Sequence, residues 1–298
     1  MKYLNTALTL AALTLTTQGH AVCGKWTAKQ SGALDQRIID EASGLIASKV
    51  KKDMFIWSND SGGKAELYAT GVSGKVERTV ALSGFSNSDF EAIANGPCIN
   101  KKAENCIYVG DIGDGIGWRS TFKIGVFKES DFWTKTSIAP EKVINFSYPK
   151  GAENAEGMVV TRDGKITIFS KDGSGITQIY QLTSTGRISH LGEVDLNKIL
   201  EAARGKGPRI TDASLSADEK RVLLLTYGDI AEVSAELLLR PQTRRAWQRG
   251  TDYNIIKGPG LPQQETIAYT AGDSSFIVST ESPKGDAPAV LLYSCQSR

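Results

Sequence analysis

The chain repeats one eight-residue pattern five times: EASGLIAS (41–48), DFEAIANG (89–96), NAEGMVVT (154–161), ITDASLSA (210–217) and QQETIAYT (263–270). The copies align without gaps and recur every 48 to 65 residues. Each has a polar residue in its third position, followed by the small and apolar residues of a short buried strand. These third-position residues are Ser43, Glu91, Glu156, Asp212 and Glu265. A repeat of this length indicates a fold built from similar supersecondary units.

Further strand-like segments follow each repeat in the same order. Apolar runs that end in Ser, Gly or Thr come first, as in MFIWSNDSGG (54–63) and CIYVGDIGDG (106–115). Third runs follow: AELYATG (65–71), FKIGVFK (122–128), TQIYQLT (177–183), AELLLRP (235–241) and AVLLYSC (289–295). Candidate fourth strands include KVERTVAL (75–82), KVINFSY (142–148) and GRISHLGEV (186–194). Four strands per repeat predict an all-β fold, a five-bladed β-propeller of four-stranded antiparallel blades.

The two ends of the chain complete this prediction. The fifth repeat ends at its third strand, and CGKWTAKQ (23–30) can supply the missing fourth, so we expect the N-terminal strand to close the ring. Cys295 ends that third strand and Cys23 begins the fourth, which places the two cysteines side by side in antiparallel neighbours. The sequence therefore predicts a Cys23–Cys295 disulfide, with Cys98 and Cys106 pairing inside the second repeat.

The first residues have the pattern of a secretory signal. Lys2 precedes an apolar run over 7–15, and Gly19 and Ala21 are the small residues expected before a cleavage site. That run is too short to span a bilayer. We predict a signal peptide over 1–21, a single propeller domain over 22–298, and a secreted or periplasmic protein, because disulfides persist in such compartments.

Charge and histidine content exclude several function classes. The formal net charge of +2 argues against a nucleic-acid groove or a polybasic membrane surface. The chain has two histidines, of which His20 lies in the predicted signal and His190 in a predicted strand. Zinc sites and histidine-based triads normally need more. We expect no nucleic-acid partner, no membrane insertion and a monomer.

The third-position residues predict a metal site. In a propeller the inner strands of all blades start on one face, and the second strands end on it, so these residues converge at one mouth of the axis. Adjacent carboxylates are unfavourable unless a cation or protons neutralise them. Oxygen ligands favour a hard cation, and calcium tolerates irregular sites best. We therefore predict Ca²⁺ bound by Ser43, Glu91, Glu156, Asp212 and Glu265. The alternative is that these acids cap strands or pair with basic residues of neighbouring blades.

The same residues resemble two families of propellers. The third-position column looks like the axial calcium site of the calcium-activated nucleotidases, the five-bladed apyrases, and WSNDSGG (57–63) and YVGDIGDG (108–115) are similar to their strand-and-turn segments. In that resemblance the ligands map onto Ser43, Glu91, Glu156 and Glu265, whereas Asp212 departs from an expected serine. The segments EASGLI, DFEAIA, NAEGMVV and GDIGDG with Arg119 also resemble exported bacterial propellers grouped with phytase-like and esterase-like domains. Either resemblance implies a calcium propeller and a hydrolase of phosphate esters or anhydrides.

One functional hypothesis is an enzyme. Its candidate catalytic residues are Asp60, Asp111, Asp114, Arg119 and Lys171. The aspartates would activate water beside the ion, and the basic residues, with Arg209, would hold the phosphate oxygens of a small anionic substrate. The GDIGDG segment also has a plain interpretation as a tight turn.

The other hypothesis is a binding or scaffold propeller with a structural calcium ion. Its partner would be a protein or a carbohydrate, contacting Trp118, Trp133 or Trp247, because tryptophan combines a large apolar surface with one hydrogen-bond donor. The sequence does not decide between the two hypotheses.

Overall fold

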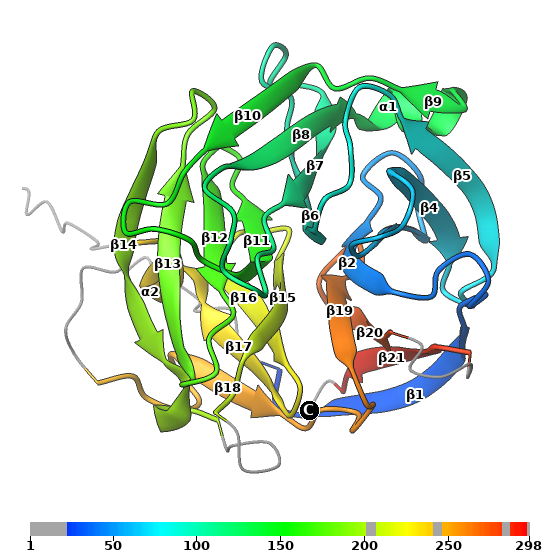
Figure 1. Cartoon of the computed structure of the whole chain (residues 1–298). Coiled ribbons are helices and arrows are strands. Elements are labelled where there is room, and N and C mark those ends of the chain that lie inside the picture. The colour runs from blue at the N-terminus through cyan, green and yellow to red at the C-terminus, as the bar shows by residue number, and fades with distance from the viewer. Residues whose placement is uncertain (1–22, 201–206, 241–245, 282–286, 297–298) are drawn as a thin grey trace, which may run out of the picture.

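The computed structural model describes residues 23–200, 207–240, 246–281 and 287–296. These residues form five sheets arranged around a central axis, each of them a blade of four antiparallel strands (Figure 1). The predicted five-bladed β-propeller is therefore confirmed. The predicted signal peptide lies outside the described residues. Within the described ranges, no helix combines the length and apolar character that crossing a membrane requires.

Each blade begins with an inner strand at the axis: β2 (Ala42–Ala47), β6 (Phe90–Pro97), β11 (Ala155–Val160), β15 (Ile210–Leu215) and β19 (Gln264–Tyr269). The second strands are β3 (Met54–Asn59), β7 (Asn105–Asp111), β12 (Ile166–Ser170), β16 (Arg221–Thr226) and β20 (Ser275–Thr280). The third strands are β4 (Glu66–Gly71), β8 (Phe122–Lys128), β13 (Ile176–Leu182), β17 (Ile230–Ser234) and β21 (Ala289–Cys295). The outer strands are β5 (Val76–Leu82), β10 (Lys142–Phe146), β14 (Ile188–Asp195), β18 (Tyr253–Ile256) and β1 (Trp26–Ala33). A short strand, β9 (Ser137–Ile138), adds a parallel partner to β5.

The helical segments are short and lie between strands: α1 (Glu129–Thr134), α2 (Ala235–Leu239) and a 3₁₀ turn over Leu196–Lys198. One predicted strand was wrong. The segment AELLLRP was expected as the third strand of the fourth blade, but its first five residues form α2, and β17 takes the strand position instead. Ala, Glu and Leu all have high helix propensity, and the turn after β16 is shorter than the sequence pattern suggested.

The N-terminal strand closes the ring as predicted. β1 pairs with β21 in antiparallel register, with Trp26 opposite Cys295. Cys23 and Cys295 form a disulfide whose Cα atoms are 5.8 Å apart, and Cys98 and Cys106 form the other, with Cα atoms 4.9 Å apart. Both predicted pairings are confirmed. The fifth blade is thus completed by both ends of the described chain and locked covalently.

Apolar side chains fill the space between neighbouring blades. The inner strands β2, β11 and β19 are buried along their whole length, whereas the outer strands β5 and β14 include exposed residues. Tyr108 of β7 and Val160 of β11 belong to one such cluster, which joins the second and third blades. Each square ångström of apolar surface that these contacts remove from water contributes about 25 cal/mol, so they stabilise the packing of each blade against its neighbours. The core is therefore distributed around the axis, and the two mouths are left for polar groups.

Candidate metal centre

A β-bulge near the start of each inner strand sets which side chain faces the mouth. In β6, β11 and β19 the residue skipped by the pairing register is Glu91, Glu156 and Glu265, respectively. In β2 the irregularity covers Ser43 and Gly44. Bulges re-aim side chains at strand ends, and here they place four of the five predicted third-position residues at equivalent positions.

Asp212 is the exception among the third-position residues. In β15 the bulge falls on Thr211, and Asp212 pairs with Leu225 in the regular register. The Asp212 carboxylate is fully buried and accepts hydrogen bonds from the backbone N–H groups of Ala213, at 2.7 Å, and of Ile267 in the next blade, at 2.8 Å. Its oxygens therefore join two blades, and Asp212 is not one of the three carboxylates, Asp60, Asp89 and Glu91, whose oxygens approach one another.

Three carboxylates meet at the mouth between the first and second blades. One oxygen each of Asp60, Asp89 and Glu91 lies within 4.8 Å of the others. Calcium binds oxygens at 2.3–2.6 Å, so two ligands on opposite sides of one ion are about 4.8 Å apart. Ser43 donates a hydrogen bond of 3.0 Å from its Oγ to Glu91 Oε2. These four residues offer only oxygen ligands, which fits a hard cation.

A close backbone approach shapes this group of acids. Gly113 of the GDIGDG segment lies so near that a Cβ there would be 2.6 Å from Glu91 Cγ, and it would be nearer still to Asp89 Oδ2. A larger residue at position 113 would therefore occupy the space beside the two carboxylates. The backbone N–H of Gly113 donates to the carbonyl oxygen of Asp89 at 3.2 Å, which fixes the segment against the start of β6.

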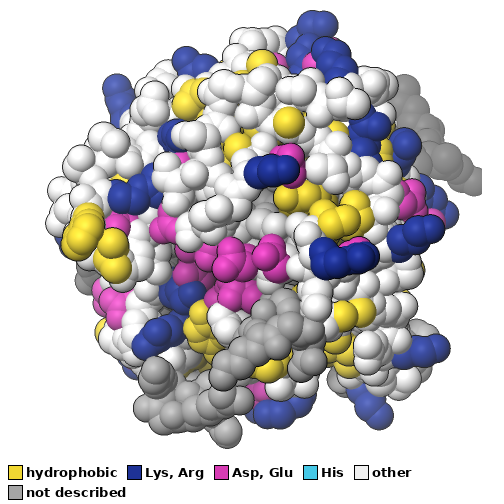
Figure 2. All heavy atoms as spheres, turned by 45° about the vertical axis from the view of Figure 1, so that its right-hand side comes forward, with side chains coloured by type: hydrophobic (Ala, Val, Ile, Leu, Met, Phe, Trp, Pro, Cys, Tyr) yellow, Lys and Arg dark blue, Asp and Glu magenta, His cyan; other side chains and the backbone are white. Residues whose placement is uncertain are grey.

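The opposite side of the mouth contains an internal lysine. The Lys171 ammonium forms an ion pair with Glu156 Oε1 and lies 3.5 Å from Glu265 Oε1. Tyr227 donates a hydrogen bond from its hydroxyl to the same Glu265 oxygen, and Lys171 lies over its ring. Glu156 Oε2 is buried and has no hydrogen-bond partner among the described residues. Figure 2 shows Asp and Glu side chains gathered in one area of the surface, with Lys or Arg beside them.

Burial changes the protonation of these carboxyls. It raises the pKa of Asp60 to about 6, against the opposing hydrogen bond from the Ser61 N–H. It also raises the pKa of Glu156 to about 8, although Lys171 acts in the opposite direction. The pKa of Glu91 stands well above its ordinary value, first because of burial and then because Glu156 is close. The mouth therefore holds protons near neutral pH unless a cation replaces them.

The GDIGDG aspartates, predicted to activate water, are engaged in holding their own loop. Asp111 is fully buried, with Arg119 Nη2 at 2.7 Å and Lys123 Nζ at 3.2 Å. Asp114 accepts hydrogen bonds of 2.9 Å from the backbone N–H groups of Trp118 and Arg119. The Arg119 guanidinium also donates to the carbonyl oxygens of Gly113 and Asp111. These contacts favour the turn interpretation of the segment.

The remaining candidates are spread over the molecule. Arg209 packs against Gly173, whose added Cβ would be 2.9 Å from the arginine Nη2. Trp118 is 83 % exposed, whereas Trp133 is buried and Trp247 is partly buried against the core between the third and fourth blades. Among the predicted residues, Asp60, Lys171, Ser43, Glu91, Glu156 and Glu265 therefore meet at the mouth.

Asp89 is the site residue that the sequence interpretation missed. It stands two positions before Glu91, outside the third-position column, in the turn that leads into β6. The D-x-E spacing at the start of the second repeat was the available signal.

Comparisons with known proteins show a similarity of fold alone. No family model matches the sequence, and no curated protein matches it. The structure is similar to a selenomethionine-substituted virginiamycin B lyase from Staphylococcus aureus, at 11% identity over 89% of this chain and 74% of that one, with a TM-score of 0.40. It is also similar to a streptogramin B lyase (8% identity, 91% and 98% covered, TM-score 0.46) and to a PQQ-bound aldose sugar dehydrogenase from Streptomyces coelicolor (11%, 92% and 99%, TM-score 0.47). At these sequence identities the similarity covers the fold, and only the residues of this chain indicate the chemistry of its acidic mouth.

Proposed function

We propose that this protein is an exported propeller that binds one calcium ion at its acidic mouth. The observation that carries the proposal is the convergence of oxygens from Asp60, Asp89 and Glu91 within one ion's coordination sphere. The Ser43 hydroxyl contacts Glu91 and completes the set. Two disulfides support export, because such bonds persist in oxidising compartments.

Glu156 and Glu265 take a different part in this proposal. Because Lys171 lies between them, they already have a positive partner, and Glu156 Oε2 remains as a further buried acceptor facing the mouth. The proposed ligand set is therefore smaller than the five residues expected from the sequence. It consists of Asp60, Asp89, Glu91 and Ser43, with Glu156 next to them.

Isothermal titration with calcium tests the proposal directly. We expect one ion per chain, and Asp89→Asn should weaken the affinity by about tenfold or more, because calcium affinity follows the number of charged ligands. Asp163→Asn is a matched control, since that carboxylate is exposed and pairs with the exposed Lys165. Absence of binding, or equal losses in both variants, would overturn the proposed site.

A second candidate function is calcium-dependent hydrolysis of a phosphate ester or anhydride. It is favoured by the position of Asp60, whose raised pKa of about 6 suits a general base, and of Lys171, whose side chain is 14% exposed at the same mouth. In this second candidate Asp60 is not a calcium ligand, and Asp89, Glu91 and Ser43 would hold the ion. A water oxygen attacks phosphorus while Asp60 accepts its proton. The bond from phosphorus to the leaving oxygen breaks, and solvent protonates that oxygen. A bound cation would polarise the phosphoryl group.

Phosphate release from nucleotides, phytate and aryl phosphates, with calcium and with chelator, tests the hydrolase. Asp60→Asn should abolish release while the near-ultraviolet circular dichroism stays native. Silence of the wild-type protein across this panel, with calcium bound, would support the non-catalytic scaffold. In that case the exposed Trp118 is the first residue to test for a protein or carbohydrate partner.

A further inference from the structure

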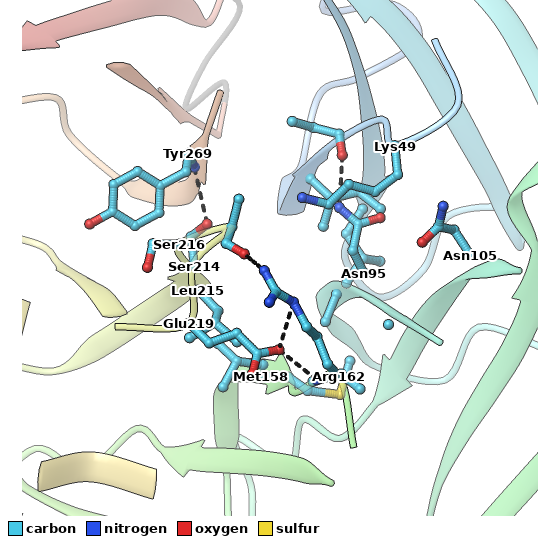
Figure 3. A pocket seen from close by; sticks show the side chains of 18 of the residues that line it. Lys49, Asn95, Asn105, Met158, Arg162, Ser214, Leu215, Ser216, Glu219 and Tyr269 are labelled. Atoms are coloured by element: carbon cyan, nitrogen blue, oxygen red, sulfur yellow. Dashed lines mark hydrogen bonds and ion pairs between the residues drawn. The ribbon is translucent and has the colours of Figure 1, made fainter. Parts of the chain in front are cut away.

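A second cavity opens at the opposite end of the axis from the acidic mouth. It is lined by the C-terminal ends of the five inner strands and the turns that follow them, and its volume is about 510 Å³ (Figure 3). This volume is within the range of small-molecule sites, about 300–1,000 Å³. None of the residues of the candidate metal centre lines it.

The inner part of this cavity is apolar. Ile93, Met158 and Val160 line it, together with Leu45 and Leu215. Ile93 and Met158 are buried, and Leu215 is partly buried. Such a surface favours an apolar ligand body, because each square ångström of apolar surface removed from water contributes about 25 cal/mol.

The acidic groups of the lining already have partners. Both oxygens of Asp273 accept hydrogen bonds from the backbone N–H of Ala217, at 2.9 and 2.8 Å. Glu219 Oε1 accepts a hydrogen bond from the backbone N–H of Arg162 and pairs with its guanidinium at 3.8 Å. Figure 3 shows this arginine reaching across to Glu219. Arg162 therefore offsets the charge of Glu219, and the two lysines of the lining, Lys49 and Lys102, outnumber the remaining carboxylate of Asp273.

Two basic residues of the cavity lining lack ion-pair partners among the described residues. Lys49 follows β2, Lys102 lies in the loop after β6, and both are exposed residues of the cavity lining. Within the part of the chain that the structure describes, neither ammonium group has an ion-pair partner. Asn95 donates from Nδ2 to the carbonyl oxygen of Ala47 at 2.7 Å, while its Oδ1 is buried without a partner. The cavity thus combines an apolar interior, unpaired positive charge and one free acceptor.

We infer that this cavity is a binding site for a small organic anion with an apolar body and an N–H or O–H donor. The apolar body lies against Leu215 and Val160, and the anionic group lies between Lys49 and Lys102. The donor pairs with Asn95 Oδ1. This site is independent of the calcium site, because the two are at opposite ends of the inner strands.

Fluorescence titration with 8-anilinonaphthalene-1-sulfonate tests the inference, since this probe has a sulfonate, apolar rings and an N–H group. We expect saturable binding of one probe per chain, unchanged by calcium chelator. Decanoate should displace the probe, and decanol, which has the same apolar length without the charge, should displace it at least about tenfold less well.

Variants separate the site from general surface binding. The double variant Lys49→Ala, Lys102→Ala should weaken probe binding by about tenfold or more. Lys52→Ala is the matched control, because Lys52 is exposed in the turn after Lys49 and does not line the cavity. Ala217→Trp should block the cavity sterically, with native circular dichroism. Non-saturable binding, an unchanged affinity in the double variant, or equal displacement by decanol and decanoate would overturn the inference.

Discussion

Replacing Lys171 by methionine removes the positive charge from the buried side of the acidic mouth. Its ammonium forms an ion pair with Glu156 and lies 3.5 Å from Glu265 Oε1, and the side chain is 14% exposed. At an effective dielectric constant of about 20, one such contact at this distance is worth roughly 5 kcal/mol before desolvation is subtracted. Breaking a buried ion pair from one side usually costs about 3–5 kcal/mol. We expect Lys171→Met to lower the free energy of unfolding by that amount at pH 10, where Glu156 is ionised in the wild type.

The loss should depend on pH in a defined direction. The pKa of Glu156 is raised by burial to about 8, and Lys171 opposes that rise. A carboxyl whose folded pKa is above its unfolded value loses stability as pH rises toward the folded value. Removing Lys171 raises the folded pKa further, so the variant loses more stability than the wild type as the pH rises above about 8, where Glu156 ionises in the wild type. At pH 5 Glu156 is protonated in both proteins, and the difference should shrink to about 1 kcal/mol or less.

Thermal denaturation at pH 5 and pH 10, in the presence of calcium chelator, measures both effects. A loss of 3–5 kcal/mol corresponds to a melting temperature lower by roughly 6–15 °C for a domain of this size. Lys165→Met is the control, because Lys165 pairs with Asp163 on the surface and such pairs contribute about 0–1 kcal/mol. The reasoning is refuted if the two variants lose the same amount at pH 10, or if the Lys171 variant loses as much at pH 5.

Four further outcomes are expected. Replacing both Cys23 and Cys295 by serine should lower the free energy of unfolding by up to about 5 kcal/mol in urea titrations, because the bond joins residues 272 apart, and an unchanged midpoint would contradict this. Gly113→Ala should weaken calcium binding in calorimetry, since the new Cβ would be 2.6 Å from a site carboxylate side chain; equal affinity would argue against the site. Below the Asp60 pKa of about 6, calcium binding displaces a proton from this carboxyl, so the calcium affinity should rise about tenfold per pH unit. An affinity that does not change between pH 5 and 6 would exclude Asp60 as a ligand. Asp212→Asn should lower stability by about 1–3 kcal/mol and leave calcium affinity unchanged, because this carboxylate binds only backbone N–H groups; a lost affinity would place it in the site.

The blade architecture could be predicted from the sequence because it depends on local and repeated signals. Apolar runs bounded by turn residues mark strands one by one, and five copies of one pattern fix the blade count. The Cys23–Cys295 pairing followed from strand order alone. The pattern predicts a strand over the AELLL segment, and this prediction is wrong. The third strand of that blade is β17, which ends at Ser234, and AELLL forms α2 directly after it.

The details of the site depend on geometry that a gapless alignment cannot represent. In the fourth repeat the bulge falls on Thr211, one residue before the aligned column, and the Asp212 carboxylate accepts a hydrogen bond from Ile267 of the next blade. Asp89 was missed because it stands outside the aligned column. The pairing of Asp111 with Arg119 and Lys123 depends on tertiary contacts, so the sequence could not distinguish a catalytic aspartate from one that holds a turn.

The charge difference between the two ends of the axis follows from the symmetry of the fold. All five inner strands run in the same direction along the axis, so residues at their starts gather at one mouth and residues at their ends gather at the other. A repeated acidic position near the strand start therefore makes one mouth acidic, as Glu91, Glu156 and Glu265 do. At the other end, Lys49 and Lys102 have no ion-pair partner among the described residues, whereas Glu219 pairs with Arg162. The proposed cation and the proposed anion would therefore bind at separate mouths, without competing for the same residues.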